Sequence, residues 1–494
     1  MDEILTFGTI VLVVAAALAL ALLALKLTER FPIPGPALFL VAAAAASDIF
    51  PELGDRLSIQ TAERIGVVAL ILILFDGGMN VGWRRFRSSA FPIASLGIIG
   101  TFATAAVVAV CAHYLFDFSW TTAGLVGAAL APTDPAVMFS IFGNREVGGR
   151  SGTILEGESG ANDPVGIALM IGVLEYATND HASFWNAFGD FALAMVVGGL
   201  VGVASGMALI PIMRRFSLPS EGLYPLRTLA AALVIYGLAT LGHGSGFLAV
   251  FVAGLLVGDV RAPYKAEVER FHKSLASLGE IVVFVVLGLT ISLSEVGKTS
   301  VWLDGLLLAL LLAFLARPLV VGALLVPVRL RLGERLFVLW GGLKGAVPIL
   351  LGTLAILEAA PGATRVYGII FVVVLFSVVV QGSSMPLVAA RLGVPMRVVE
   401  QEPWDVSIRL RREPRGVRRY VVAEGARAAG DTIRELPLGE HAWISMIVRD
   451  GEPYPPRGST VLEPGDEVLV LAERVDDGAL RRLFQQSRRR AAQP

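Results

Sequence analysis

The feature that most constrains this chain is a succession of long apolar runs between residues 4 and 389. A helix needs about 20 predominantly apolar residues to cross the hydrocarbon core of a bilayer. Thirteen runs satisfy this requirement, so we predict an all-α polytopic membrane domain with 13 transmembrane helices over residues 1–390. The runs are 4–26, 32–50, 61–80, 90–115, 120–143, 153–176, 186–212, 223–242, 245–259, 275–293, 301–327, 333–357 and 364–389.

Basic residues gather in every second loop between these runs. Arg84, Arg85 and Arg87 follow the third run, and Arg214 and Arg215 follow the seventh. Loops with an excess of Lys and Arg usually stay in the cytoplasm. The pattern therefore predicts that the N-terminus lies outside and the C-terminus in the cytoplasm; the membrane itself is expected to be the inner (plasma) membrane of a bacterium. It also supports an odd number of helices.

The composition excludes several other classes of protein. Charged residues make up 17% of the chain, whereas about 25% is usual in a soluble domain. The single cysteine, Cys111, can form neither an internal disulfide nor a cysteine-rich metal site. A net charge of −1 gives no reason to expect a nucleic-acid partner. The sequence has no pair of nucleophile and base and no phosphate-binding loop, so an enzyme is not expected.

Two of the predicted helices have unusual interiors. The fifth contains Ala-Pro-Thr-Asp-Pro at 131–135, and the twelfth contains Gly-Gly-Leu-Lys-Gly-Ala-Val-Pro at 341–348. Proline removes a backbone donor, glycine tolerates irregular backbone, and unwound backbone at membrane depth occurs only inside protein or along a watery cavity. Two such segments, seven helices apart, suggest inverted repeats with crossed broken helices 5 and 12. Simple proline kinks are the alternative.

A small set of ionisable residues is predicted to lie at membrane depth. A charge there is expensive and marks a functional site by default. Two bases can pair with two of the acids, which leaves about two acids to bind a cation or a proton, because either one neutralises a buried carboxylate. Competition between the two for one site is the minimal requirement of an exchanger. The set comprises Asp76, Asp134, Glu158, Asp163, Arg317 and Lys344.

We assign the central role to Asp163, which is expected to hold the cation and the proton in turn. Asp134, the hydroxyls of Thr133 and Ser159 and loose backbone carbonyls are expected to complete an oxygen shell of the kind that hard cations prefer. Asp163 and Asp134 are thus the residues expected to hold the transported monovalent metal ion. Asn162 directly precedes Asp163.

The remaining charges have supporting roles in this scheme. Glu158 is expected to pair with Arg317, and a purely structural pair is the favoured interpretation. Lys344 is expected to offset either helix C-terminal dipoles or the negative charge of Asp134 at the helix crossing. Asp76 either lines an ion funnel or simply ends a helix, and the sequence favours neither.

These residues together resemble the monovalent cation:proton antiporter-1 family, which includes the NhaP-type Na⁺/K⁺:H⁺ antiporters. The resemblance implies a 13-helix inverted-repeat fold, a core domain that moves against a dimerisation domain, and a homodimer. The motifs that carry it are, in order, Phe75-Asp76-Gly77-Gly78, Thr133-Asp134-Pro135, Glu158-Ser159-x-x-Asn162-Asp163-Pro164, Arg317-Pro318 and Gly341-Gly342-Leu343-Lys344-Gly345.

The resemblance also implies roles for single residues. An Asn-Asp pair marks electroneutral exchange in this family, and in this chain Asn162 precedes Asp163. Lys344 departs from the family, which usually has arginine there; the charge is kept and bidentate pairing is lost. By the same resemblance the cation ligands are Thr133, Asp134, Ser159 and Asp163, and the structural ion pair is Glu158 with Arg317.

The charged C-terminal region is predicted to be cytoplasmic. Residues 391–415 form a basic linker, either solvated or in contact with anionic lipid headgroups; residues 416–486 form a small α+β domain; residues 487–494 are expected to be disordered. Through Arg-Asp-Gly-Glu at 449–452 and Leu-Glu-Pro-Gly-Asp at 462–466, the domain resembles the TrkA-C regulatory domain. The resemblance implies dimerisation through the tail and a small regulatory ligand such as a nucleotide. The dinucleotide-binding partner half, with its Gly-x-Gly-x-x-Gly, is absent from the sequence, and no cofactor is expected.

We therefore predict an electroneutral antiporter that exchanges K⁺ or Na⁺ for H⁺ by alternating access and is regulated by its cytoplasmic domain. The resemblance of the tail to regulators of potassium transport favours K⁺, and a Na⁺-selective antiporter is one alternative. A cation channel is the other, because four deep acids could line a pore. The expected partners are the cation, protons, membrane lipid and a second copy of the chain.

Overall fold

The computed structural model describes residues 34–50, 57–134, 142, 145–179, 184–298, 300–398, 417–438, 442–449, 452–472 and 477–486, together with residues 19 and 23. The first predicted run therefore falls almost entirely outside the described residues. Most of the predicted linker, 391–415, and the predicted disordered end, 487–494, also fall outside the described residues. The chain divides into two compact units, Met1–Pro403 and Trp404–Pro494, and each is described by itself.

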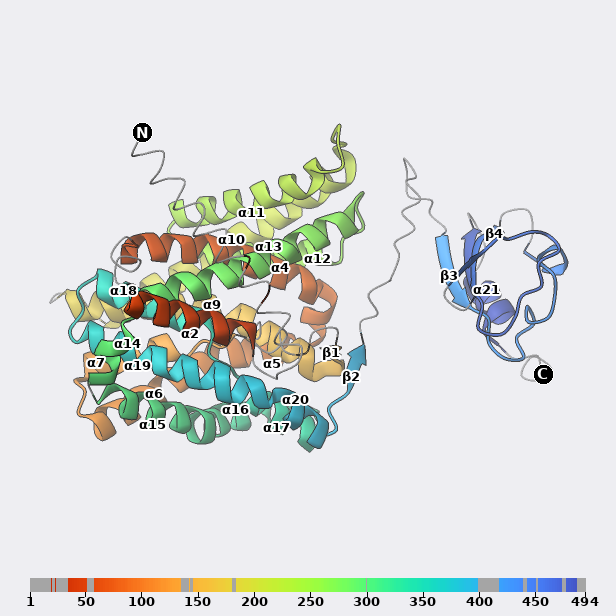
Figure 1. The fold of residues 1–494 in the computed structure, drawn as a ribbon. Coiled ribbons are helices and arrows are strands. Elements are labelled where there is room, and N and C mark those ends of the chain that lie inside the picture. The colour runs from red at the N-terminus through yellow and green to blue at the C-terminus, as the bar shows by residue number, and fades with distance from the viewer. Residues whose placement is uncertain are drawn as a thin grey trace. The chain divides into compact units, whose positions relative to one another are not determined.

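The first unit is built almost entirely of helices (Figure 1). Its helices are α2 (Gly35–Ile49), α4 (Ile59–Ser88), α5 (Ala90–Ala94), α6 (Thr101–Phe116), α7 (Trp120–Leu130), α9 (Gly149–Thr178), α10 (Phe184–Arg215), α11 (Leu223–Leu241), α12 (Gly246–Gly258), α13 (Lys265–Leu289), α14 (Leu293–Lys298), α15 (Val301–Leu311), α16 (Arg317–Leu325), α17 (Leu332–Trp340), α18 (Ala346–Leu357), α19 (Ala363–Phe376) and α20 (Ser383–Arg391). Three π-helical segments, η1 (Ser95–Gly100), η2 (Leu312–Ala316) and η3 (Ser377–Gly382), continue the helices before them, and β1 (Arg145–Val147) pairs antiparallel with β2 (Met396–Val398).

Seven helical spans in the described part of the chain are long and apolar enough to cross a membrane, and the shorter apolar helices α2, α7, α12 and α18 accompany them. This confirms a polytopic all-helical unit; the number 13 stays a prediction. The predicted run 61–80 ends close to the kink at Gly82 that divides α4, whereas the predicted run 275–293 is too narrow at its charged start, since α13 begins at Lys265. Apolar content marks only the portion of a helix that lies in hydrocarbon, and helices continue beyond it into the headgroup region.

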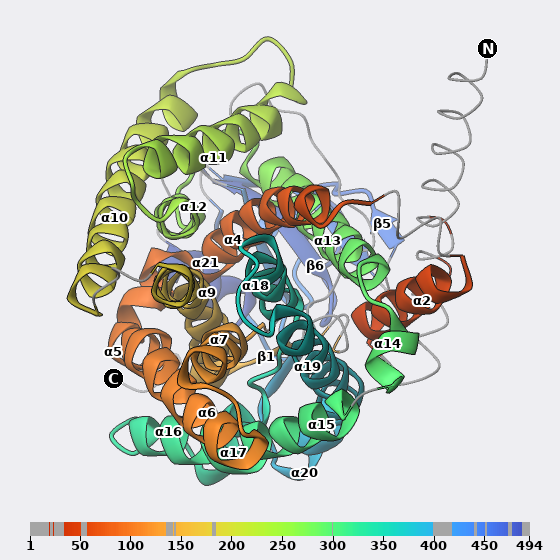
Figure 2. The same cartoon turned by 90° about the vertical axis from the view of Figure 1, so that its left-hand side faces the viewer.

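The helices form two groups that are seen best end-on (Figure 2). The first group, which we call the flanking helices, comprises α2, α4, α11, α12 and α13, which pack on one another. The second group, which we call the site helices, comprises α7, α9 and α16 to α19. α18 belongs to both neighbourhoods, because it packs on α7, α9 and α19 and also on α4 and α13. α9 also packs on α4 and α12, so the contacts of both α9 and α18 join the two groups.

Small residues allow close packing among the flanking helices. A Cβ atom at Gly78 of α4 would lie 2.5 Å from the carbonyl oxygen of Phe251 in α12, and one at Gly254 would lie 2.6 Å from that of Phe75. Close backbone approach through small residues is a common way for helices to associate in lipid. The glycine at the end of the 75–78 motif thus has a packing role.

Two helices are interrupted where proline and glycine predicted irregular backbone. α7 ends at Leu130 and residues 131–134 are not helical; residues 341–345 separate α17 from α18 in the same way. The backbone N–H of Asp134 donates to the carbonyl oxygen of Leu343 at 2.8 Å. The two interruptions therefore contact each other directly. Most of the continuation of the fifth predicted helix lies outside the described residues.

The second unit is a small domain around a four-stranded antiparallel sheet with strand order β3-β6-β4-β5. Buried side chains alternate along β6, and Tyr420 stacks on Phe484 with ring centroids 5.4 Å apart. The strands and short helices agree with the predicted α+β domain. The elements are β3 (Val417–Val421), the 3₁₀-helix η4 (Ile433–Glu435), β4 (Ala442–Arg449), β5 (Glu452–Tyr454), β6 (Glu467–Ala472) and α21 (Asp477–Phe484).

Candidate ion-binding site

The interruption after α7 is held in place by two polar side chains of α9. Ser159 Oγ donates to the carbonyl oxygen of Thr133 at 2.6 Å. Asn162 Nδ2 donates to Thr133 Oγ1 at 2.7 Å, and Asn162 Oδ1 accepts from the backbone N–H of Thr133 at 3.3 Å. Residues three apart share one face of a helix, so both side chains reach the same segment. The amide of Asn162 thus serves as a clamp on the unwound backbone.

Asp163 is buried beside this clamp. Its side chain lies in α9, which continues as one helix through Pro164. Within the described part of the chain its Oδ1 is buried and has no hydrogen-bond partner. An ionised carboxylate without a partner is costly to bury, so it either takes up a proton or binds a cation. The charged neighbours of Asp163 are Asp134 and Lys344, and its unpaired Oδ1 is a candidate to bind a proton or a cation.

Asp134 faces the start of α18. The backbone N–H of Ala346 points at Asp134 Oδ2 at 3.4 Å, and a Cβ atom at Gly345 would lie only 2.0 Å from the same oxygen. The N-terminus of a helix carries unpaired N–H groups and a partial positive charge, which favour a carboxylate. Gly345 is thus required sterically, because a side chain there would displace the carboxylate of Asp134.

Lys344 belongs to the unwound segment between α17 and α18 and reaches the end of α7. Its Nζ donates to the carbonyl oxygens of Ala131 and Pro132, each at 2.9 Å, and its backbone N–H donates to Ser377 Oγ at 2.8 Å. The carbonyls at the end of α7 have no intrahelical donor and carry a partial negative charge. Lys344 therefore binds the C-terminal end of α7, the first of the two roles considered for it.

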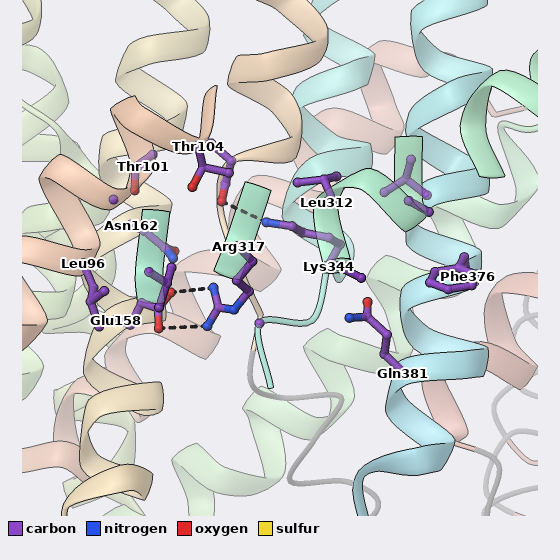
Figure 3. Close-up of a pocket in the computed structure, with 17 residues that line it drawn as sticks. Leu96, Thr101, Thr104, Glu158, Asn162, Leu312, Arg317, Lys344, Phe376 and Gln381 are labelled. Carbon is purple, nitrogen blue, oxygen red and sulfur yellow. Dashed lines mark hydrogen bonds and ion pairs between the residues drawn. The ribbon is translucent and has the colours of Figure 1, made fainter. Parts of the chain in front are cut away.

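Glu158 and Arg317 form a buried bidentate ion pair (Figure 3). Arg317 Nη1 and Nη2 donate to Glu158 Oε1 at 2.8 Å and Oε2 at 3.1 Å, and Arg317 also donates to the carbonyls of Leu339 and Val338. A Cβ atom at Gly342 would lie 2.0 Å from the guanidinium. The pair thus ties α9 to α16 and to the end of α17, and both of its charges are compensated.

A cavity of about 20 Å³ lies between this ion pair and Lys344 (Figure 3). A volume of this size can hold about one water molecule where polar groups line it. Asn162, Thr101 and Thr104 contribute polar atoms to its wall.

Asp76 lies away from these residues, in α4 of the flanking helices. It is buried, and Asn80 Nδ2 donates to its Oδ2 at 2.8 Å. Its charged neighbours are Lys273, Glu269 and Lys265 of α13. It sits in the first part of α4, six residues before the kink at Gly82.

The set of acids predicted at membrane depth is incomplete. Glu280 lies in α13, and its Oε1 is buried without a hydrogen-bond partner among the described residues. The sequence carries the necessary signal, since Glu280 is the single charged residue of the apolar run 275–293.

The proteins to which this chain is similar are exchangers of sodium or potassium ions for protons. A model of the family described as sodium/hydrogen exchanger, transmembrane, matches residues 7–391, and the TrkA-C domain matches residues 417–485. Among curated proteins, the K⁺/H⁺ antiporter NhaP of Alkalimonas amylolytica is 34% identical over 429 residues, which covers 84% of this chain and 73% of that protein. The K⁺/H⁺ antiporter NhaP2 of Shewanella oneidensis is 31% identical over 479 residues, which covers 93% of this chain and 80% of that protein.

A solved structure is similar as well. The sodium proton antiporter MjNhaP1 from Methanocaldococcus jannaschii, at pH 8, superposes with a TM-score of 0.67 at 25% sequence identity. The match covers 79% of this chain and 99% of that one.

Proposed function

The chain belongs to the transmembrane sodium/hydrogen exchanger family, and from that premise we propose that it exchanges K⁺ or Na⁺ for H⁺ one for one, with Asp163 holding either ion. It is a multi-pass membrane protein and a cation/proton antiporter, in a family of transporters rather than of enzymes in the usual sense. The observation that carries the proposal is the buried Oδ1 of Asp163, which has no partner in the described part of the chain.

The cation site consists of oxygen atoms around Asp163. Ser159 lies four residues before Asp163, so their side chains share one face of α9. Asp134 is a charged neighbour of Asp163, and Thr133 is held against Ser159. Carboxylate, hydroxyl and carbonyl oxygens are the ligands that hard monovalent cations accept most readily. A cation and a proton then compete for Asp163, because each neutralises it.

Exchange is electroneutral in this scheme. Glu158 and Arg317 neutralise each other, and Lys344 binds the carbonyls at the end of α7. Asn162 carries no charge. Asp163 is then the one group in the site that changes partner during the cycle, and one cation replaces one proton.

Alternating access follows from the two helix groups. The proposed ligands Thr133, Asp134, Ser159 and Asp163 all belong to the site helices or to the interruption after α7. The site helices move against the flanking helices and present Asp163 to each side of the membrane in turn. The fifth predicted helix, which begins with α7, and the twelfth, which comprises α17 and α18, cross at this point in an inverted-repeat fold.

Relatives with K⁺ in their names favour K⁺ as the physiological cation, and the sodium-specific name of MjNhaP1 keeps Na⁺ as the second candidate. The protein lies in the bacterial inner membrane with its C-terminal domain in the cytoplasm, as the loop charges predict. The TrkA-C domain regulates exchange, with a small ligand such as a nucleotide as the candidate effector. Two chains form the working unit.

Ion flux in sealed proteoliposomes tests the function. A pH-sensitive dye inside the vesicles and a potential-sensitive dye are read together after a K⁺ or Na⁺ gradient is imposed, for wild type and Asp163→Asn. We expect the cation to move protons without a change in membrane potential, and we expect Asp163→Asn to abolish proton movement.

The same experiment decides for or against the channel. A channel would conduct the cation without moving protons and would generate a membrane potential. Exchange that persists in Asp163→Asn would leave the antiporter in place and move the site elsewhere.

A further inference from the structure

Glu280 lies at membrane depth in α13. It is nine residues from the end of this helix, or ~14 Å at 1.5 Å per residue. That is roughly half of the hydrocarbon thickness of a bilayer. Phe284 and Leu287 follow it at helical spacing and are fully buried, so this stripe of α13 faces protein. Glu280 is therefore a carboxylate inside the protein at the level of the bilayer core.

The two oxygens of a buried carboxylate need partners, and Glu280 differs in this respect from Glu158. Glu158 has both oxygens bound by the guanidinium of Arg317. Glu280 Oε1 is buried with no hydrogen-bond partner in the described part of the chain. Among the described residues, Asp163 Oδ1 is the other carboxylate oxygen in this situation. Asp163 has the opposite charge of Lys344 nearby, whereas the charged neighbour of Glu280 has the same sign, so Glu280 needs a proton or a cation to neutralise it.

The charged neighbour of Glu280 is Asp134. Asp134 lies at the N-terminal end of α18, and α18 packs on α13. Figure 2 shows α13 and α18 side by side. Asp134 is in turn a charged neighbour of Asp163. Asp134 is thus a charged neighbour of both Glu280 and Asp163, and Lys344 is a further charged neighbour of Asp163.

The three carboxylates belong to different helix groups. Asp163 and Asp134 come from the site helices and the interruption after α7, whereas Glu280 comes from the flanking helices. Like charges at close range repel unless a cation or a proton lies between them. A movement between the two groups changes the distance from Glu280 to Asp134 and leaves the pair of Asp134 and Asp163 intact.

We propose that Glu280 is a further cation-binding residue, contributed by the flanking helices, which binds the dehydrating monovalent cation together with Asp134 on its way to or from Asp163. This inference rests on the proposed antiporter function. In the state that is open toward Glu280, the cation bridges Glu280 and Asp134 and displaces a proton from Glu280 to the solution on that side. When the cation moves on to Asp163, Glu280 takes a proton back from the same side, so the one-for-one exchange across the membrane is unchanged.

The competing explanation is a permanently protonated Glu280 with only a packing role. Glutamine has nearly the shape of protonated glutamate, so Glu280→Gln separates the two explanations. If Glu280 is always neutral, the substitution leaves transport unchanged. If Glu280 binds the cation, the substitution removes a charged ligand and weakens cation binding.

The test is the apparent KM for K⁺ and for Na⁺ in proteoliposomes, measured for wild type, Glu280→Gln, Glu280→Asp and Asp163→Asn. We expect Glu280→Gln to raise the apparent KM about tenfold or more with a maximal rate within about twofold of wild type, as expected for loss of ground-state binding. Glu280→Asp keeps the charge, and its apparent KM should lie between those of wild type and Glu280→Gln. The matched control is Glu175→Gln, which removes a half-exposed acid from α9 and should behave as wild type.

Folding is checked by thermal unfolding in detergent with and without the cation. A cation that binds only the folded protein raises the melting temperature. We expect Glu280→Gln to melt normally without cation and to gain less from a given K⁺ or Na⁺ concentration.

The outcomes separate this inference from the proposed function. Wild-type exchange, an inactive Asp163→Asn and an unchanged apparent KM in Glu280→Gln would overturn the role of Glu280 alone. A wild type that moves cations without protons would overturn the antiporter itself.

Discussion

At the scale of single residues, the buried carboxylates differ in what compensates their charge. Glu158 is matched by a bidentate arginine, and Asp134 faces the N-terminus of α18. Asp163 and Glu280 each keep one buried oxygen without a partner in the described part of the chain. An acid that is paired with a base holds two helices together, whereas an acid with an unpaired oxygen can bind an ion. On this difference rests our proposal of a structural role for Glu158 and transport roles for Asp163 and Glu280.

Removal of one partner of the buried pair should destabilise the protein. In Glu158→Gln the guanidinium of Arg317 stays buried without its carboxylate, and breaking such a pair typically costs about 3–5 kcal/mol. We expect a lower melting temperature in detergent than for wild type or for the control Glu175→Gln. Simultaneous Glu158→Gln and Arg317→Gln should recover part of the loss. A single variant that melts like wild type would exclude a stabilising role for the pair.

The sequence indicates candidate site residues, which stay predictions, but it does not indicate their contacts. The rarity of charge in apolar runs indicates Asp134, Asp163 and Lys344, and the resemblance to an antiporter family is confirmed by the family match. That the amide of Asn162 clamps Thr133, or that Lys344 binds the end of α7, depends on tertiary packing between distant segments. Glu280 is absent from the predicted set although its sequence signal is of the same kind.

At the scale of elements, the interruption between α17 and α18 is shaped by the side chains that press on it. Gly342 lies against the guanidinium of Arg317, and Gly345 lies against the carboxylate of Asp134. Prolines and glycines predict where these helices open. The charged start of α13 is harder to predict, because its polar residues give no sign that the helix continues beyond the hydrocarbon.

A methyl group at Gly345 should disturb the site. The Cβ atom of Gly345→Ala would lie 2.0 Å from Asp134 Oδ2, so the carboxylate must move. A displacement of this order can reduce the rate by about tenfold to a hundredfold. The control is Gly237→Ala in α11, where a Cβ atom meets nothing within 4 Å. Equal exchange rates for the two variants in proteoliposomes would show that the position of Asp134 is unimportant.

The tail domain depends on one arginine of β4. Arg449 donates to both carboxylate oxygens of the buried Asp466, each at 2.8 Å, and these hydrogen bonds hold the pKa of Arg449 above its usual value. Arg449→Met leaves Asp466 buried and without its arginine, so the domain should become susceptible to trypsin in the full-length protein. Arg419→Met, which removes an exposed pair with Glu467, should change little. Equal digestion of the two variants would contradict this.

At the scale of the whole molecule, the loop charges set the orientation in the membrane. Arginines lie at the ends of α4 and α10, whereas Glu175 lies at the end of α9. The loop after α9 is therefore expected outside, and the loop between α10 and α11 inside. An outward N-terminus and a cytoplasmic regulatory domain both depend on this assignment.

Cysteine labelling tests the orientation. In a Cys111→Ala background, cysteines are introduced as Asn179→Cys after α9 and Glu221→Cys before α11, both at exposed positions. A membrane-impermeant maleimide added to intact cells should label the first variant and should label the second only after permeabilisation. The reverse pattern would invert the topology.

Competition between cation and proton at Asp163 is tested most directly by the number of protons released when the cation binds. Purified protein in weakly buffered detergent solution is titrated with K⁺ or Na⁺ while the pH is recorded, for wild type and Asp163→Asn. If one carboxylate holds either ion, wild type should release close to one proton per bound cation under mildly acidic conditions, and Asp163→Asn should release none. Cation binding by wild type without proton release would contradict competition at Asp163 and, with it, the one-for-one exchange of cation for proton.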